Sequence, residues 1–156
     1  MFVFMNEKEC FENEFLIFRE LKEDDYGNDY FNLLSQLTKA ENISENDFKN
    51  ALTEINKNGN VFVFEDKNNG KIAATAKLLI EQKLIRGGGK VGHLEDVVVD
   101  KDYRKYGLGK KIVLNLVDLA KEKGCYKIIG NCDDSVIKFY EKIGFENKGN
   151  EIAIYF

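Results

Sequence analysis

The chain has 156 residues, 44% of them hydrophobic, which is enough to bury one sizeable core and too little for two full domains. Its 23 basic and 27 acidic residues are mixed along the sequence and give a formal net charge of -4, so it lacks the basic surface expected for binding nucleic acid or an anionic membrane. We expect a single domain spanning residues 1–156 and, if the ligand is an anion, a local basic site.

Cysteine and histidine usage excludes further classes of protein. Cys10, Cys125 and Cys132 are odd in number and lack metal-ligand spacing, so we expect neither a disulfide framework nor a metal site. Residues 1–5 are apolar but lack the preceding basic residues of a signal peptide, and no apolar run is long enough to span a membrane. These features predict a cytoplasmic protein that binds neither membranes nor nucleic acid.

The first half of the chain predicts, in order, a strand, two helices and a β-hairpin: residues 15–19, 24–39 and 44–57, then 61–64 with 71–80. The second helix begins at Ser44 and has Asp47 three residues later, which resembles a capping box. The turn of the hairpin is rich in Asp, Asn and Gly, the residues that favour turns.

The second half predicts two strand–helix units and a closing strand: residues 91–99 with 107–123, 126–129 with a helix from Asp133 or Asp134 through 143, and 151–156. Three glycines at 87–89 form the preceding turn, and Gly124 ends the long helix. Together with the first half, this order predicts an α/β (α+β) fold, in which a mixed central β-sheet is flanked by helices on both faces.

Residues 92–109 carry the strongest functional signal. Arg104 is followed by Gly107 and Gly109 in a loop that opens a long helix, whose first N–H groups lack partners and therefore favour a phosphate. Lys105 and Lys110 add positive charge at this point. The spacing does not fit the G-x-G-x-x-G loop of dinucleotide-binding folds. An ordinary strand-to-helix turn is the alternative interpretation.

Three side chains have the chemistry for proton transfer. Glu95 and Asp96 interrupt an apolar strand, and because adjacent strand residues face opposite sides, we expect at least one of them near a ligand. A locally satisfied charge pair is the alternative. Tyr140 lies on the apolar face of a short helix, as a core aromatic does, yet its phenol can protonate a thiolate leaving group. His93 fits a hydrogen-bonded structural residue better than a general base.

The loop resembles the Q/R-x-x-G-x-G/A signature with which the GNAT superfamily of N-acetyltransferases holds the pyrophosphate of acetyl-CoA. Residues 92–99, 124–129 and 139–145 are similar to the glucosamine-6-phosphate N-acetyltransferase family. The resemblance implies a GNAT fold, acetyl-CoA as cosubstrate without a metal, and formation of N-acetyl-D-glucosamine 6-phosphate for UDP-N-acetylglucosamine biosynthesis. It also implies a homodimer with the sugar site near the subunit boundary.

Carried over residue by residue, the resemblance implies three sets of site residues. The catalytic set is Tyr140, as the acid that protonates the thiolate, with Glu95 and Asp96. The acetyl-CoA set is Val97, Val98, Val99, Arg104, Lys105, Tyr106, Gly107, Leu108, Gly109, Lys110, Asn131 and Tyr140. The sugar-phosphate set is Thr38, Lys83, Arg86, Glu95, Asp96, Val97, Tyr126 and Lys127.

The sequence departs from this family at four places. Lys105 stands where glycine is usual, Arg86 where histidine is frequent, and Asn131 where aspartate is expected. Residues 154–156 end the chain without the expected basic residue, so we expect phosphate binding to be redistributed.

Two other functions remain as alternatives. One is a GNAT enzyme acting on another small amine or a protein N-terminus, and the other is a non-catalytic acyl-CoA-binding module. The acidic pair and the basic residues near Tyr126 favour the sugar phosphate over the first, and Tyr140 with the intact glycine loop favours an enzyme over the second. No cysteine has the adjacent base of an acyl-enzyme nucleophile, so we expect direct transfer.

Overall fold

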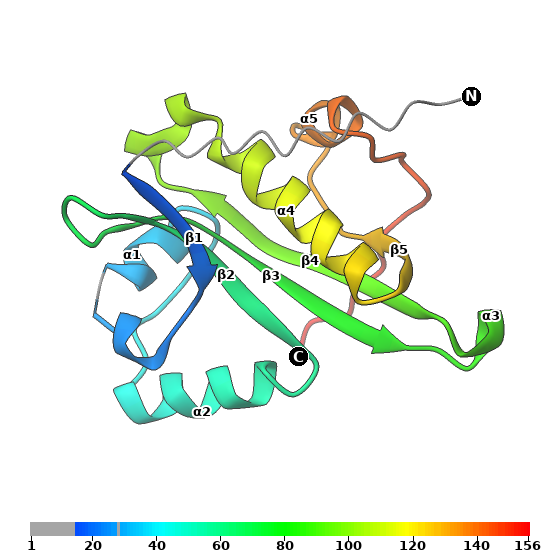
Figure 1. The fold of residues 1–156 in the computed structure, drawn as a ribbon, viewed down its shortest axis with the longest axis horizontal. Helices are drawn as coiled ribbons and strands as arrows, with labels where there is room; N and C mark the ends of the chain where they lie inside the picture. Colours follow the sequence, from blue (N-terminus) through cyan, green and yellow to red (C-terminus); the bar gives the residue numbers. More distant parts are fainter. Residues whose placement is uncertain (1–14, 28) are drawn as a thin grey trace.

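The computed structural model describes residues 15–27 and 29–156 and contains one five-stranded sheet (Figure 1). The strands lie across it in chain order: β1 Leu16–Glu20, β2 Gly59–Asp66, β3 Ile72–Gln82, β4 Lys90–Val99 and β5 Cys125–Ile129. The strands β1 to β4 are antiparallel to one another in sequence, and β5 is parallel to β4. The helices are α1 Tyr30–Leu34, α2 Glu45–Ile55, α3 Ile85–Gly88, α4 Leu108–Glu122 and α5 Ile137–Lys142, with 3₁₀ turns η1 Glu23–Asp25 and η2 Lys101–Tyr106. The predicted mixed sheet is confirmed.

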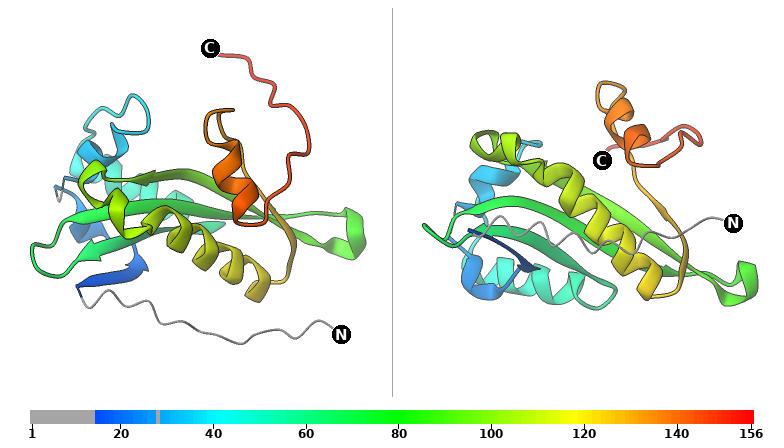
Figure 2. Two further views of the ribbon diagram at one scale, coloured as in Figure 1. Left: turned by 90° about the horizontal axis from the view of Figure 1, so that it is seen from above. Right: turned by 45° about the horizontal axis from the view of Figure 1, so that its top comes forward.

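α4 covers one face of the sheet and buries the larger part of the core (Figure 2). Its residues Ile112, Val113 and Leu116 are fully buried and recur at helical spacing, as predicted. They pack with Leu78 of β3 and Leu94 of β4. This packing fixes the direction of α4 relative to β4, and therefore the position of the turn between them.

α1 and α2 cover the opposite face, so helices flank both faces, as predicted (Figure 2). Phe48 and Leu52 of α2 lie one helical turn apart and pack with Leu33 of α1 and with Val61 and Val63 of β2. No helix among the described residues is both long and apolar enough to cross a bilayer.

α2 begins where the sequence predicts. The Ser44 hydroxyl accepts a hydrogen bond from the Asp47 N–H at 3.1 Å and donates one to the Asp47 carboxylate at 2.6 Å. The serine therefore caps the helix. The Asp47 carboxylate accepts from the serine hydroxyl rather than from the serine backbone N–H, so only one of the two bonds of a capping box is present.

A network around Arg19 ties β1 to the turn that leads into α1. Arg19 donates two hydrogen bonds of 2.7 Å to the Asp25 carboxylate and one of 2.7 Å to Glu65. Hydrogen bonding to Asp25, and then to Glu65, raises the pKa of the Arg19 guanidinium despite its burial. These charge-assisted bonds from one guanidinium hold η1 against the sheet.

The single helix predicted over 24–39 is wrong. The chain instead forms η1, a break, and the five-residue α1. Gly27 and Asp29 adopt positive φ angles of 88° and 57°, which interrupt a right-handed helix. Only α1 carries buried apolar residues, Tyr30 and Leu33, whereas the buried residue of η1 is Asp25.

Two predictions near the C-terminus are also wrong. α5 begins at Ile137 rather than at Asp133 or Asp134, because the Val136 N–H bonds to the Asp133 carbonyl in a preceding turn. The strand predicted at 151–156 does not form. Those residues have no regular structure, are exposed, and run away from the sheet (Figure 2). A strand forms only when its backbone pairs with another, and this segment pairs with no strand among residues 15–27 and 29–156. Residues 1–5 and Cys10 lie outside the described residues.

Candidate active site

β4 and β5 separate part-way along their length. Their pairing ends at His93 of β4 and Ile129 of β5. A Cβ at the next residue, Gly130, would lie 2.9 Å from the carbonyl oxygen of Leu94, so glycine permits the close approach from which β5 turns away. Among the described residues, no strand pairs with that edge of β4 beyond His93. The backbone of residues 97–99, predicted to bind acetyl-CoA, therefore lies on an open edge.

A β-bulge interrupts the same stretch of β4. Thr75 pairs with Val98 and Lys77 with Glu95, so two residues of β4, Asp96 and Val97, oppose one residue of β3. Asp96 has a φ of 52° in the left-handed region, which costs about 1–2 kcal/mol for a residue with a side chain. Such local strain is typical of functional sites.

The bulge corrects the expectation that Glu95 and Asp96 face opposite sides. Asp96 and Lys77 line the same cavity of about 170 Å³ between the sheet and the helices α1 and α2. Glu95 is the register partner of Lys77 and shares its face. Both carboxylates therefore lie on the α1–α2 face, because the extra residue of the bulge breaks the alternation.

The turn from β4 into α4 places free N–H groups beside the open edge. Gly107 has a φ of 67°, ends η2 and precedes α4. As the residue at the N-cap position it offers no side chain to the first N–H groups of α4, which remain free for an anion. A Cβ at Gly109 would lie 3.6 Å from a methyl carbon of Val99, so this helix start is adjacent to the end of β4.

Basic side chains follow the same turn. Arg104, Lys105 and Lys110 are exposed and lie within three residues of Gly107. Lys105 occupies η2, where an ordinary side chain fits, and its Nζ lies 5.2 Å from the centre of the Tyr106 ring. The glycine usual at this position is therefore not required. Leu108, also predicted to contact acetyl-CoA, is fully buried and offers only its backbone.

Sequence reasoning missed a polar network beneath this turn. Asp100 accepts hydrogen bonds from the Asp102 N–H at 2.9 Å and from the Gln36 amide at 3.1 Å, and its other contact is the Lys71 ammonium at 3.0 Å. These partners hold the pKa of the Asp100 carboxyl below its usual range although burial opposes them. Gln36 also accepts from the Lys101 N–H at 2.9 Å. The network ties the residues after α1 to η2; a glutamine 64 positions from its partner gives no sequence signal.

Tyr140 lies on α5 and packs against the core cluster that α4 forms with the sheet. Its half-buried ring packs edge-on against Phe139 at 5.1 Å and Phe145 at 5.5 Å. Phe139 in turn lies 3.5 Å from a Cβ placed on Gly109, which brings α5 against the start of α4. Burial, with a smaller effect of Cys132, raises the pKa of the Tyr140 phenol. The Tyr140 hydroxyl forms no hydrogen bond within the described residues. Its ring therefore packs in the core while its proton remains available to a ligand.

The predicted sugar-phosphate cations gather at the other end of β4. Arg86 and Lys127 lie 5.5 and 5.8 Å from the centre of the Tyr126 ring and have no acidic partner within the described chain. Lys83 instead contacts Glu81 at 2.5 Å, and Glu81 also bonds His93 at 2.7 Å. His93 is therefore a hydrogen-bonded structural residue, as predicted. Lys83 and then His93 lower the pKa of Glu81.

One chain does not bring all the predicted substrate residues together. Glu95 is five residues along β4 from Lys90, where the hairpin begins, a separation of about 17 Å at ~3.3 Å per residue. The hairpin tip with Arg86 extends further still (Figure 1). Thr38 and Asn131 are exposed and have no regular structure or side-chain bond in the described structure. The acidic group, Glu95 and Asp96, thus lies in the middle of β4, and the basic group lies at and before its first residues.

Comparisons with known proteins agree with this geometry. The sequence profile of the acetyltransferase (GNAT) family matches residues 17–145. The chain belongs to this family. Members use acetyl-CoA, which fits the open edge of β4 and the free N–H groups after Gly107.

Relatives of similar length narrow the comparison. Glucosamine 6-phosphate N-acetyltransferase of Arabidopsis thaliana is 41% identical over 141 residues, covering 88% of this chain and 95% of that protein. The enzyme of the same name from Candida albicans is 37% identical over 142 residues, covering 89% and 95%. The crystal structure of the Arabidopsis enzyme superposes with a TM-score of 0.86 at 40% identity, covering 90% of this GNAT chain and 98% of that one.

Proposed function

We propose that this chain transfers the acetyl group of acetyl-CoA to the 2-amino group of D-glucosamine 6-phosphate. The observation that carries the proposal is the unpaired edge of β4 beside the Gly107 turn, in a chain about 40% identical to several enzymes of that name. The product is N-acetyl-D-glucosamine 6-phosphate, the precursor for UDP-N-acetylglucosamine biosynthesis, and we expect the reaction in the cytoplasm.

In this proposal acetyl-CoA lies along the open edge of β4. Its pyrophosphate binds the first N–H groups of α4, with Arg104, Lys105 and Lys110 nearby. Its amide groups pair with the backbone of residues 97–99, as an added strand pairs with a sheet edge. A backbone N–H of the same stretch polarises the thioester carbonyl, which stabilises the oxyanion of the transition state.

The acidic pair of β4 and the phenol of Tyr140 carry out the proton transfers. Glu95 or Asp96 takes a proton from the sugar ammonium, and the neutral nitrogen attacks the thioester carbonyl carbon. A C–N bond forms, the C–S bond breaks, and the departing sulfur takes the proton of the Tyr140 phenol. The nitrogen releases its second proton to solvent as the amide forms, and solvent returns a proton to Tyr140. Burial raises the pKa of this phenol, so it carries its proton at neutral pH.

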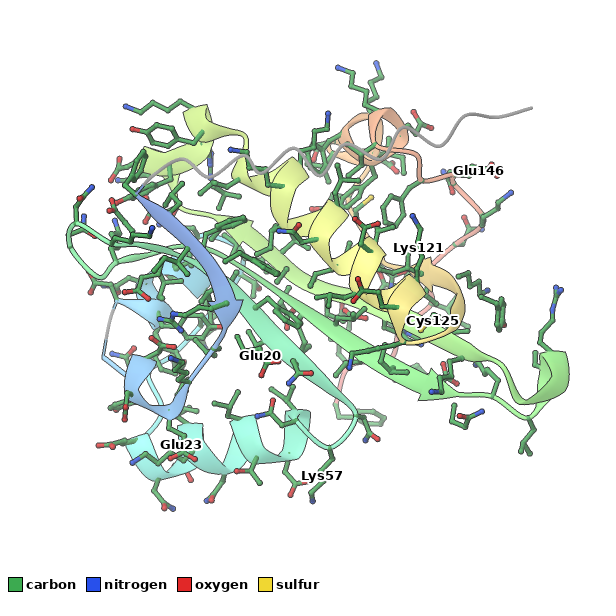
Figure 3. All side chains as sticks on the ribbon, in the orientation of Figure 1. Glu20, Glu23, Lys57, Lys121, Cys125 and Glu146 are labelled. Atoms are coloured by element: carbon green, nitrogen blue, oxygen red, sulfur yellow. The ribbon has the colours of Figure 1, made fainter. Side chains whose placement is uncertain are left out.

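A covalent acetyl-cysteine has no support in the site. Cys125 lies beside the C-terminal end of α4 (Figure 3), and the 15 residues of that helix separate it from Gly107 by about 22 Å. Burial raises the pKa of both Cys125 and Cys132, which keeps each thiol protonated and poorly nucleophilic. Direct transfer in a ternary complex remains the proposal.

The separation of the acidic and basic groups supports a homodimer. In this arrangement a second copy places its Arg86, Tyr126 and Lys127 beside the Glu95–Asp96 pair of the first. Residues 151–156 supply an apolar, exposed segment, and the outer edge of β5 is unpaired among the described strands. Two guanidinium or ammonium groups around one aromatic ring then hold the 6-phosphate.

Replacing Tyr140 with Phe removes the proton donor and keeps the packing with Phe139 and Phe145. We expect kcat to fall about 10²-fold or more, with the Kd for acetyl-CoA nearly unchanged, since a general acid acts in the transition state. Steady-state kinetics and calorimetry measure the two quantities. An unchanged kcat, where chemistry limits turnover, would return Tyr140 to a purely structural role.

Thiol release from acetyl-CoA with a panel of amines tests the proposed substrate. Glucosamine 6-phosphate should give the highest kcat/KM, well above glucosamine, because each charge-assisted contact contributes about 1.5–3 kcal/mol. Lys127→Met should raise KM for the phosphorylated sugar and shrink that advantage. Equal kcat/KM for the two sugars would overturn the assignment. Preference for another amine would indicate a different GNAT substrate, and acetyl-CoA binding without thiol release would indicate a non-catalytic module.

Mixing two impaired variants tests the shared site. Chains carrying Tyr140→Phe and chains carrying Lys127→Met are unfolded together and refolded, and activity is measured below the wild-type KM for the sugar. If Lys127 serves the partner's Tyr140, mixed dimers contain one intact site, and about a quarter of wild-type sites return. Activity equal to the mean of the separate variants would place both residues in the same subunit's site.

A further inference from the structure

The left-handed Asp96 at the bulge of β4 is held by one side chain of the neighbouring strand. The Lys77 ammonium lies 2.8 Å from the Asp96 carboxylate and crosses from β3 to β4 at the point where the register shifts. The Lys77 side chain is 22% exposed, whereas that of Asp96 is 54% exposed. The surroundings therefore restrict the Lys77 ammonium more than they restrict the Asp96 carboxylate.

The pair lies at the mouth of the cavity between the sheet and the helices α1 and α2. Lys77 and Asp96 are the only charged residues among the described side chains that line it, and the others are mostly apolar, such as Leu21, Phe48 and Val61. No other charged group of the cavity wall competes for either partner, so the contact sets the direction of the Asp96 side chain.

The neighbouring carboxylate, that of Glu95, has no such partner within the described chain. Glu95 is paired with Lys77 in the strand register and shares its face, yet it has no ion pair or side-chain hydrogen bond within the described chain. Because the Lys77 ammonium is engaged by Asp96, Glu95 remains available to an incoming ammonium. The two acidic residues, which the sequence presents as one pair, therefore have unequal surroundings.

We propose that Lys77 is a positioning residue for acetyl transfer: it holds Asp96 and the bulge, and it leaves Glu95 as the carboxylate that receives the proton of the acceptor amine. The inference rests on the proposed function. The bulge sets the direction of the Val97 backbone on the open edge, where the thioester is expected. Loss of Lys77 then disturbs the reacting geometry without removing a group that touches either substrate.

Kinetics of three variants test this role. Lys77→Met should lower kcat about 10-fold, with KM for acetyl-CoA within about twofold, since positioning acts on the transition state. Lys77→Arg, which keeps a cation within reach of Asp96, should recover most of the loss. The matched control is Lys57→Met, at an exposed ion pair with Glu54 at the end of α2 (Figure 3), and it should leave kcat and KM unchanged.

A double substitution separates Lys77 from Asp96. In an Asp96→Asn background, Lys77→Met should cause little further loss of kcat, because the interaction is already weakened. A wild-type kcat for Lys77→Met, or the same 10-fold loss in both backgrounds, would overturn the proposal.

A readout without turnover distinguishes this inference from the proposed function. In the ligand-free protein, Lys77→Met should shift the amide resonances of Asp96 and Val97 and speed their hydrogen exchange, while Lys77→Arg should resemble the wild type. If wild-type protein fails to acetylate glucosamine 6-phosphate, the proposed function fails, but these amide changes still support Lys77 as the residue that holds the bulge. Unchanged amides would show that the bulge does not depend on Lys77.

Discussion

The parting of β4 from β5 at Gly130 is the constraint on which the candidate site depends. Parallel pairing up to His93 holds the two strands together, and beyond it the backbone of β4 loses one neighbour. An unpaired strand edge inside a folded protein is costly unless something else bonds to it. We propose that acetyl-CoA is that partner, and the Gly107 turn follows the end of the same strand.

The surrounding structure keeps that edge rigid. α4 packs along the sheet and fixes the turn at its own first residue, while the Asp100 network joins η2 to Gln36 after α1. On the other side, Phe139 packs near Gly109 and brings α5 and Tyr140 to the same place. The proposed sites for acetyl-CoA, for the acceptor amine and for the acid Tyr140 therefore depend on different parts of the fold, and all three lie around β4. A small shift in any of them would separate the reacting groups.

Much of this architecture could be predicted because its signals are local. The hairpin, the amphipathic α4 and the glycines of the turn follow from periodicity and backbone freedom. The bulge could not be predicted, since it depends on a register shift between β3 and β4, and it overturned the alternation argument for Glu95 and Asp96. The tail at 151–156 has the composition of a strand but pairs with none of the described strands.

The sugar site illustrates the same limit at a larger scale. Resemblance to a family names the acidic and basic residues together, yet the strand between them keeps the two groups apart in a single chain. The contacts of Arg86 and Lys127 with the Tyr126 ring show that the basic residues lie together within one chain.

The central claim is that acetyl-CoA adds to the open edge of β4. Residue-resolved hydrogen exchange with and without CoA tests it most directly. The account predicts slower exchange for amides of residues 97–99 that face away from β3 and for residues 108–110, with no change in the hairpin around Arg86. Protection confined to the cavity beneath α1 and α2, with residues 97–99 and 108–110 unaffected, would contradict it.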